Sequence, residues 1–110
     1  FGRAQWDGRM YVGQWENNKQ TGRGTYIEGD TRYTGGFRDG KKHGIGRIDS
    51  PEAVYVGPFD SDVPVGVGFQ LTNGRVIKVV WRDGRVIRVK TAPAAQMEKM
   101  AMLAEESIEL

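Results

Sequence analysis

The sequence predicts a mainly β protein, a single-layer antiparallel β-meander of hairpin repeats with a C-terminal α-helix. The first observation is a Tyr-x-Gly-x-Trp/Phe motif that begins at Tyr11, Tyr33 and Tyr55, which are 22 residues apart. The second is a Gly-x-Gly pair after each copy, and the third is a change to alanine, methionine and glutamate after Pro93. Because a fixed period of this length is typical of repeat architectures, we expect folded repeats and not low-complexity disorder.

The repeat period divides the chain into units. Residues 1–90 are predicted to form the β-ribbon, and residues 91–110 a linker and the C-terminal helix. The units are a partial repeat (1–10), three repeats (11–32, 33–54 and 55–76) and a degenerate repeat (77–90). Since Phe1 falls in the middle of a repeat and is not an initiator methionine, we expect the chain to be a piece of a longer protein.

The second repeat shows why a hairpin is expected. In the stretch 33–37 the two aromatic rings and Gly35 occupy alternate positions, which share one face of a β-strand. A helix with this sequence would hold its glycines internally, at a cost of about 1 kcal/mol each. Asp39-Gly40 supplies a turn that tolerates positive φ, and residues 44–48 return as the partner strand. The glycines allow a ring on one strand to lie over bare backbone on the next.

Repetition of this hairpin predicts roughly nine strands in sequential order, in a sheet about 40 Å long. Two rows of side chains should share one face, the first Tyr11, Tyr33, Tyr55 and Ile77, the second Trp15, Phe37, Phe59 and Trp81. Trp6 is expected to pack beside Trp15. In the third repeat the positions of Phe69 and Leu71 predict a bulge or register shift between Phe69 and Asn73.

The pattern Tyr-x-Gly-x-Trp/Phe-x-x-Gly-Lys-x-x-Gly-x-Gly resembles the MORN (membrane occupation and recognition nexus) repeat. Residues 33–46 match it at every marked position, and the resemblance covers residues 1 to about 90. In the first and third repeats, Asn18 and Asp62 replace the turn glycine, and Val63 replaces the lysine of the third. Thr21 and Val65 replace the histidine that precedes the Gly-x-Gly pair in the second repeat, which is His43. The resemblance implies a non-catalytic ribbon in a cytoskeletal, ciliary or membrane-linked assembly, so we expect a cytoplasmic protein associated with the cytoskeleton or a cilium.

Composition and charge exclude several classes. The chain has 27% charged residues and no apolar run of the about 18–20 residues that a membrane-spanning helix needs. Its net charge of +2 combines a mildly basic ribbon with an acidic tail, and neither part is basic enough to indicate a nucleic-acid partner. The absence of cysteine excludes disulfides and thiolate metal ligands.

No catalytic site, metal site or cofactor is predicted. His43 is the only histidine and stands at the repeat's His-Gly step, where its expected role is that of a turn residue packing on an aromatic ring. Asp60 and Asp62 lack the further ligands of a calcium loop. The Gly-x-Gly pairs lack the remaining spacing of a dinucleotide-binding fingerprint. We therefore expect no enzyme activity.

The last hairpin and the tail differ from the repeats. With the turn at Asp83-Gly84, Trp81 should lie opposite Val86, and the reverse face should show Val76, Val80, Ile87 and Val89. A helix that folds back could cap this apolar end of the sheet, because Met97, Met100, Ala101, Ala104 and Ile108 form a stripe at helical spacing. Two alternatives stay open: the methionine-rich face is offered to a partner protein or a second copy, or the tail is disordered.

The first functional hypothesis is a scaffold or protein-interaction module. Its aromatic face would bind a helix or an extended segment of another protein, because aromatic side chains concentrate binding energy in interfaces and this face is expected to be an exposed patch. The predicted partner-binding residues are Tyr11, Trp15, Tyr33, Phe37, Tyr55, Phe59 and Trp81.

The alternative hypothesis is peripheral binding to anionic phospholipids, at about 1 kcal/mol for each basic residue near a charged surface. The residues that would carry it are Arg38, Lys41, Lys42, Arg47, Arg82, Arg85, Arg88 and Lys90. A third possibility is a regulatory appendage of a catalytic domain outside the chain. Self-association at the two ends of the sheet is also possible, since both ends present a strand edge.

Overall fold

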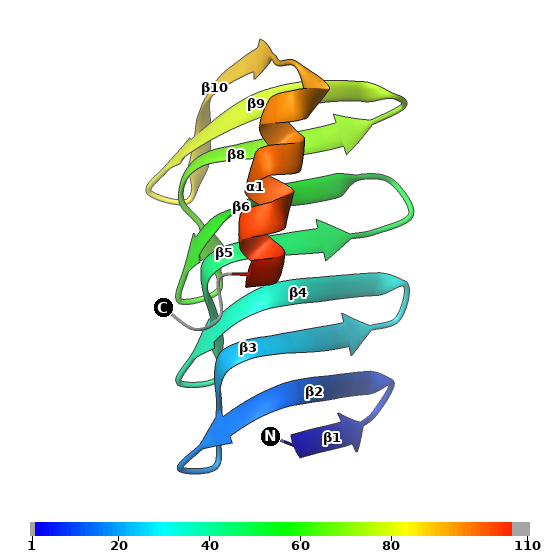
Figure 1. Ribbon diagram of the computed structural model, residues 1–110, viewed down its shortest axis with the longest axis vertical. Coiled ribbons are helices and arrows are strands. Elements are labelled where there is room, and N and C mark those ends of the chain that lie inside the picture. The colour runs from blue at the N-terminus through cyan, green and yellow to red at the C-terminus, as the bar shows by residue number, and fades with distance from the viewer. Residues whose placement is uncertain (1, 107–110) are drawn as a thin grey trace.

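The computed structural model describes residues 2–106, with side chains described up to residue 104. It shows one antiparallel sheet followed by one helix, α1 (Ala94–Glu106), so the predicted fold class is confirmed (Figure 1). The strands are β1 (Gly2–Trp6), β2 (Arg9–Glu16), β3 (Lys19–Glu28), β4 (Thr31–Arg38), β5 (Lys41–Asp49), β6 (Val54–Asp60), β7 (Val63–Pro64), β8 (Gly66–Thr72), β9 (Arg75–Arg82) and β10 (Arg85–Thr91).

The strands pair in the order of the sequence, as the meander prediction requires. Only the two-residue β7 lies off this path, where it pairs with β6. The molecule measures 40 × 27 × 24 Å, and its long axis runs across the strands. The expected sheet length of about 40 Å is therefore confirmed.

Two-residue turns close the hairpins, except between β5 and β6, where the four residues 50–53 connect the strands. Asp39 and Gly40 have φ of 51° and 81°, which are typical of the turn that matches the twist of two antiparallel strands. Asn18 and Asp62, which stand where the repeat pattern has glycine, have φ of 64° and 74°. Asparagine and aspartate tolerate this left-handed region better than other residues with a Cβ, so the turn survives both substitutions.

Two hairpins change register between a cross-strand pair of glycines and the turn, so that the tips of the hairpins bend away from the rest of the sheet. The glycine pairs are Gly13 with Gly24 and Gly35 with Gly46. The shift lies between Gly13 and Gln14 in β2, and between Gly35 and Phe37 in β4. Extra residues on the returning strand bend and twist it at such a bulge. Successive tips are then joined by backbone hydrogen bonds of 3.0 Å, in which Gly40 N–H donates to Gln20 and Asp62 N–H donates to Lys42.

The third repeat keeps the register of the other two, so the predicted shift between Phe69 and Asn73 is wrong. Tyr55 pairs with Gln70, just as Tyr11 pairs with Tyr26 and Tyr33 with Ile48. Gln70 is thus the equivalent residue, and Phe69 points to the opposite face, where it is buried beneath α1. The sequence spacing misled because a polar residue stands at an apolar position of the repeat.

The two faces of the sheet carry different layers. The side that holds Tyr11, Tyr33 and Tyr55 is called the ladder face here, and the side that holds Val56 and Phe69 is called the helix face. On the helix face α1 packs across β4, β5, β6, β8 and β9, antiparallel to the direction in which the strands follow one another (Figure 1).

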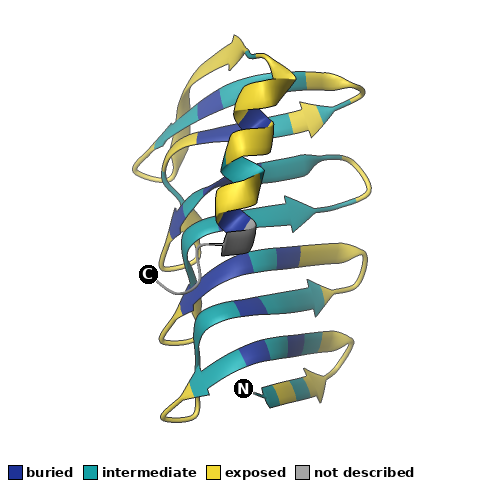
Figure 2. Ribbon diagram, in the orientation of Figure 1, coloured by how far each residue is buried: buried dark blue, intermediate teal, exposed yellow. Residues whose placement is uncertain are grey.

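Helix α1 buries the predicted apolar stripe. Met97 and Ala104 are buried against Val56 and Phe69, and Met100 and Ala101 pack beside them, whereas Ile108 lies outside the described residues. The helix therefore folds back as predicted, but it packs across β4 to β9 and leaves β10 exposed, so the expectation that it caps the end of the sheet is wrong for the last strand. Figure 2 shows buried positions on strands from β2 to β9, whereas β10 is exposed throughout.

The last hairpin contains a bulge of its own. Trp81 lies opposite Val86, as predicted, but the register shifts between Val86 and Arg88. Val89 consequently pairs with Val79 and shares the ladder face with it, so the prediction that Val89 lies on the reverse face is wrong.

Candidate functional site

Seven aromatic rings form one continuous row along the ladder face, called the aromatic ladder here. Each ring meets the next edge to face, with interplanar angles from 83° to 89° and centroid distances from 5.0 to 6.4 Å. The order is Trp15, Tyr11, Phe37, Tyr33, Phe59, Tyr55 and Trp81. The structure thus brings together all seven predicted partner-binding residues, in the geometry that aromatic quadrupoles favour.

Bare backbone beneath the tyrosine rings makes this row possible. A Cβ built on Gly24, Gly46 or Gly68 would fall against the ring of Tyr11, Tyr33 or Tyr55, respectively. The partner glycines are equally close, since a Cβ on Gly35 would lie 2.5 Å from the Cα of Gly46. The prediction that rings lie over bare backbone on the next strand is confirmed.

The ladder is a core and not an exposed patch. Tyr11 and Tyr33 are 0% and 1% exposed, and Phe37 and Phe59 are also buried. The expected exposed aromatic patch is therefore wrong for these four residues, because neighbouring rings cover one another as well as the glycines. Trp15, Tyr55 and Trp81 keep partial exposure. A binding role for the seven rings stays a prediction, and most of them could serve it only as support.

Buried hydroxyls fix the tyrosine rings in place. Tyr11 donates to the carbonyl of Gln14 at 2.9 Å, and Tyr33 donates to the carbonyl of Gly36 at 2.8 Å. Burial raises the pKa of Tyr11 to about 12, and burial together with the charge of Asp62 raises the pKa of Tyr33 as well. Both phenols are therefore neutral donors at physiological pH.

These raised pKa values predict alkaline unfolding. The unfolded tyrosine titrates near pH 10, so the contribution of the buried phenols is complete below pH 10 and is lost as the pH rises toward about 12. Each of the two should lower the free energy of unfolding by at most about 1.4 kcal/mol per pH unit in this window. Urea titrations at pH 8 and about pH 11 measure the loss. It should shrink in Tyr11→Phe/Tyr33→Phe and largely persist in Tyr26→Phe, whereas an equal loss in all three proteins would contradict the assignment.

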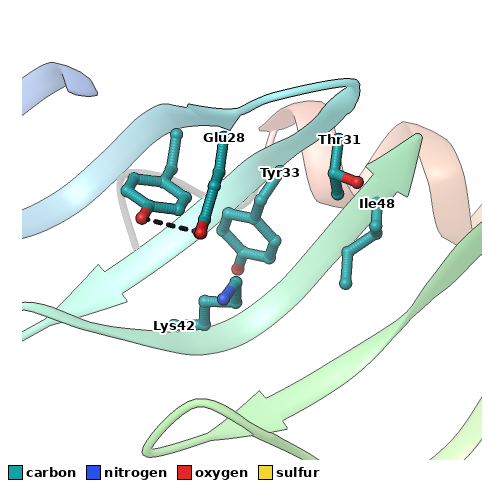
Figure 3. Close-up of a pocket in the computed structure, with 6 residues that line it drawn as sticks. Glu28, Thr31, Tyr33, Lys42 and Ile48 are labelled. Carbon is teal, nitrogen blue, oxygen red and sulfur yellow. Dashed lines mark hydrogen bonds between the residues drawn. The ribbon is translucent and has the colours of Figure 1, made fainter. Parts of the chain in front are cut away.

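A hollow on the ladder face lies beside the buried row (Figure 3). It encloses about 330 Å³ and is lined by Tyr26, Glu28, Thr31, Tyr33, Lys42 and Ile48. Tyr26 donates a hydrogen bond of 3.0 Å to Glu28, and the Lys42 ammonium lies 5.5 and 5.7 Å from the ring centroids of Tyr33 and Tyr26. The lining combines two aromatic rings and Ile48 with the polar groups of Glu28, Thr31 and Lys42. Such a lining suits a side chain of a partner, with polar groups to orient it.

A second hollow of about 270 Å³ adjoins the first and shares Tyr26, Glu28 and Lys42 with it. Trp6 forms its far wall and packs on Tyr26 at 6.4 Å, so the expectation that Trp6 packs beside Trp15 is wrong. Asp62 also borders it, 4.0 Å from the Lys42 ammonium. The two hollows together form a groove that is called the ladder groove here.

The accessible residues of the ladder groove were not among the predicted partner-binding residues. Tyr26 and Ile48 come from the returning strands and occupy the same repeat position, opposite Tyr11 and Tyr33. The signal that could have found them is their spacing of seven residues before the next repeat tyrosine or its equivalent. They remain partly exposed because the ladder rings pack toward the hairpin tips and leave this row uncovered.

The predicted lipid-binding residues do not share one surface. Lys42 lies on the ladder face, whereas Arg47 lies on the helix face and pairs with Asp49 at 3.0 Å. The eight residues belong to two hairpins, Arg38, Lys41, Lys42 and Arg47 to β4–β5 and Arg82, Arg85, Arg88 and Lys90 to β9–β10. The four of the β9–β10 hairpin all lie on the helix face, whereas Lys42 and Arg47 lie on opposite faces. Within residues 2–106, α1 is too short and too polar to cross a bilayer.

The polar residues weighed as catalytic or metal sites occupy hairpin ends. His43 lies near the start of β5, with its Nδ1 3.6 Å from Asp60. Asp62 accepts a hydrogen bond of 2.8 Å from the Lys42 amide across successive tips. Among the described residues, no three His, Cys, Asp or Glu side chains are grouped as metal ligands. Gly22 and Gly44 have φ of 62° and 78° and serve the hairpin bulges.

Comparison with known families agrees with this geometry. The model of the MORN repeat matches residues 11–27 and 33–52. Each match begins at a ladder tyrosine and includes the returning strand whose glycine lies beneath that tyrosine ring. No curated protein matches the chain. MORN repeats are commonly modules for protein or membrane interaction, and this chain is a MORN repeat protein.

Proposed function

We propose that the chain is a non-catalytic interaction module whose ladder groove binds a segment of another protein. The observation that carries the proposal is the groove itself, in which two adjoining hollows expose Trp6, Tyr26 and Ile48 beside a single lysine. Aromatic side chains in such a concave setting are the usual anchors of protein interfaces. The cytoskeletal, ciliary or membrane-linked setting of that partner is part of the proposal and rests on the resemblance to other MORN proteins.

The aromatic ladder would act as a rigid floor for this groove. Tyr33 contributes to its lining while its ring contacts Phe37 and Phe59 at 5.2 and 5.4 Å and its hydroxyl bonds to Gly36. A wall held from three sides loses little entropy when a ligand binds, which favours affinity. Of the seven predicted residues, Tyr33 and Phe37 line the groove and would support binding, while Trp6, Tyr26 and Ile48 would make the contact.

The dimensions of the groove limit the segment it can take. It runs from Trp6 on β1 to Ile48 on β5, which is four strand spacings or about 19 Å. About six residues of extended chain or about thirteen of helix span that distance. An apolar side chain would fill the hollow between Tyr26 and Ile48. A neutral carbonyl oxygen would bind the Lys42 ammonium, because Glu28 and Asp62 would repel a further carboxylate.

Photo-crosslinking followed by affinity measurement tests the proposal. A benzophenone amino acid at position 26 should capture the partner in extract, and the same group at Leu71, exposed on the helix face, should not. With the captured partner purified, Tyr26→Ala/Ile48→Ala should weaken binding by about 30-fold or more, which is the loss expected when interface anchors are truncated. The matched control is Leu71→Ala, which should change the affinity less than about twofold.

Protein folding is checked in each variant by far-UV circular dichroism and by the urea midpoint. Tyr26 and Ile48 are only partly buried, so both substitutions should leave the sheet intact. Undiminished binding by the folded double variant, or capture from position 71 but not from position 26, would contradict the proposal.

A further inference from the structure

The outer edge of the sheet at β10 combines three features. All seven residues of β10, Arg85–Thr91, are exposed, and within the described part of the chain only β9 pairs with this strand. Val86, Ile87 and Val89 are 45%, 54% and 57% exposed. A strand with a free edge leaves alternate N–H and C=O groups available to another strand.

Within β9 and β10 the charged side chains all have one sign, and the acidic residue of this hairpin is Asp83 in its turn. Five basic residues lie on the helix face of β9 and β10, namely Lys78, Arg82, Arg85, Arg88 and Lys90. None of the five forms an ion pair with another described residue. The register places Lys78 directly opposite Lys90, and Arg82 directly opposite Arg85. Like charges in such cross-strand positions destabilise a sheet. The fold therefore bears a local cost that an acidic partner would relieve.

This charge pattern argues against a second copy of the chain at the same edge. Two β10 strands paired with each other would bring Arg85, Arg88 and Lys90 of both copies together. Strand β1, at the other end of the sheet, carries Arg3 and no acidic residue, so head-to-tail pairing gains no charge complementarity. Basic residues on an edge strand are a known protection against such pairing.

We infer that β10 binds an extended acidic segment of another protein as an added strand. After the bulge at Val86 and Arg88, the stretch 88–91 pairs regularly with β9, so its free edge offers a regular row of backbone groups. Arg88 and Lys90 point to the helix face, while Val89 and Thr91 point to the ladder face. The matching segment alternates glutamate or aspartate with β-branched apolar residues, which places ion pairs on one face and apolar contacts on the other.

Strand addition provides an ordered backbone contact and a defined register, which charge attraction alone does not provide. Backbone hydrogen bonds provide affinity, and alternate side chains set the register of the added strand. This site is separate from the ladder groove, because its cations lie on the opposite face and at the far end of the sheet. The two proposals can therefore fail independently.

A blocked, fluorescein-labelled octapeptide of alternating glutamate and valine is the probe. Fluorescence anisotropy should show saturable binding to the full chain, and the amide signals of residues 88–91 should shift and gain protection from hydrogen exchange. Arg88→Glu/Lys90→Glu should weaken binding by about 30-fold or more and should create binding to the corresponding lysine–valine peptide. The matched control, Arg38→Glu/Lys41→Glu, makes the same charge change at exposed residues of another hairpin and should alter affinity by less than about threefold.

Backbone pairing is tested with two N-methylated versions of the glutamate–valine peptide, each methylated on one alternate set of amides. Only one edge of the peptide would face β10, so one version should lose binding and the other should retain it. Equal binding by both versions would overturn strand addition in favour of simple charge attraction. Failure of the peptide to bind, together with charge-dependent sedimentation on phosphatidylserine vesicles, would overturn it in favour of a membrane surface. Dimerisation of the chain through β10, seen as a doubled mass in light scattering, would also overturn strand addition. Tyr26→Ala changes the ladder groove only and should leave peptide binding unchanged.

Discussion

Replacing Gly46 with alanine should lower the free energy of unfolding by about 3 kcal/mol or more, which for a small domain is a large part of its stability. The added Cβ would enter the space of the Tyr33 ring. That ring cannot move aside, because Phe37 and Phe59 contact it at 5.2 and 5.4 Å and its hydroxyl is bonded to Gly36. Urea unfolding followed by circular dichroism measures the loss.

Gly40→Ala is the matched control for this variant. Gly40 lies in the turn of the same hairpin with φ of 81°, and a Cβ there would meet only the Gln20 Oε1, at 3.2 Å. Its cost should be the about 1–2 kcal/mol of a left-handed alanine. Equal losses for the two variants would show that the ring contact at Gly46 contributes nothing beyond the general cost of replacing a glycine.

The second large effect is expected from Phe37→Ala, which should lower the free energy of unfolding by about 3–5 kcal/mol. Phe37 is the link between two repeats, since its ring meets Tyr11 of the preceding repeat at 5.0 Å and Tyr33 of its own at 5.2 Å. In a linear array each repeat is stabilised by its neighbours, so the loss of a link should also uncouple the two sides.

Tryptophan fluorescence can detect this uncoupling. Trp15 and Trp81 stand at the two ends of the aromatic ladder, and variants that retain only one tryptophan report on one end each. The two transitions should coincide in the parent protein and separate in Phe37→Ala. Phe69→Ala removes an equally buried phenylalanine from the helix face and leaves the ladder intact, so it should destabilise without separating the ends. Coincident transitions in Phe37→Ala would contradict the role of the ladder as the link.

Much of the fold was predictable because the repeat fixes local geometry. Tyr33, Gly35 and Phe37 at alternate positions admit only a strand, and Asp39-Gly40 admits a tight turn. The row of rings followed from this alternation once the 22-residue period was recognised. The position of α1 was harder to predict, because the apolar stripe of the helix indicates that it covers an apolar surface but not which strands form that surface. Val56 and Phe69 supply that surface, whereas in the sequence the position of Phe69 instead predicts a register shift.

The candidate site was less predictable because exposure depends on packing between repeats. Tyr33 and Phe37 are aromatic in sequence, yet each covers the other, and the accessible ring in that region is Tyr26. Sequence spacing showed which face the rings share but not how far each leans toward its neighbour. The cations of β9 and β10 gather for a similar reason, since the bulge after Val86 determines that Arg88 and Lys90 face the same side as Arg82.

The orientation of α1 has a mechanical consequence. The strands lie across the long axis of the molecule, so tension applied between its two ends would peel strand pairs apart one after another, a mode that loads few hydrogen bonds at a time. Helix α1 runs along that axis and packs on five strands, from β4 to β9. It therefore braces the middle of the ribbon, and under load the strands on which it does not pack, β1 to β3 at one end and β10 at the other, would open first.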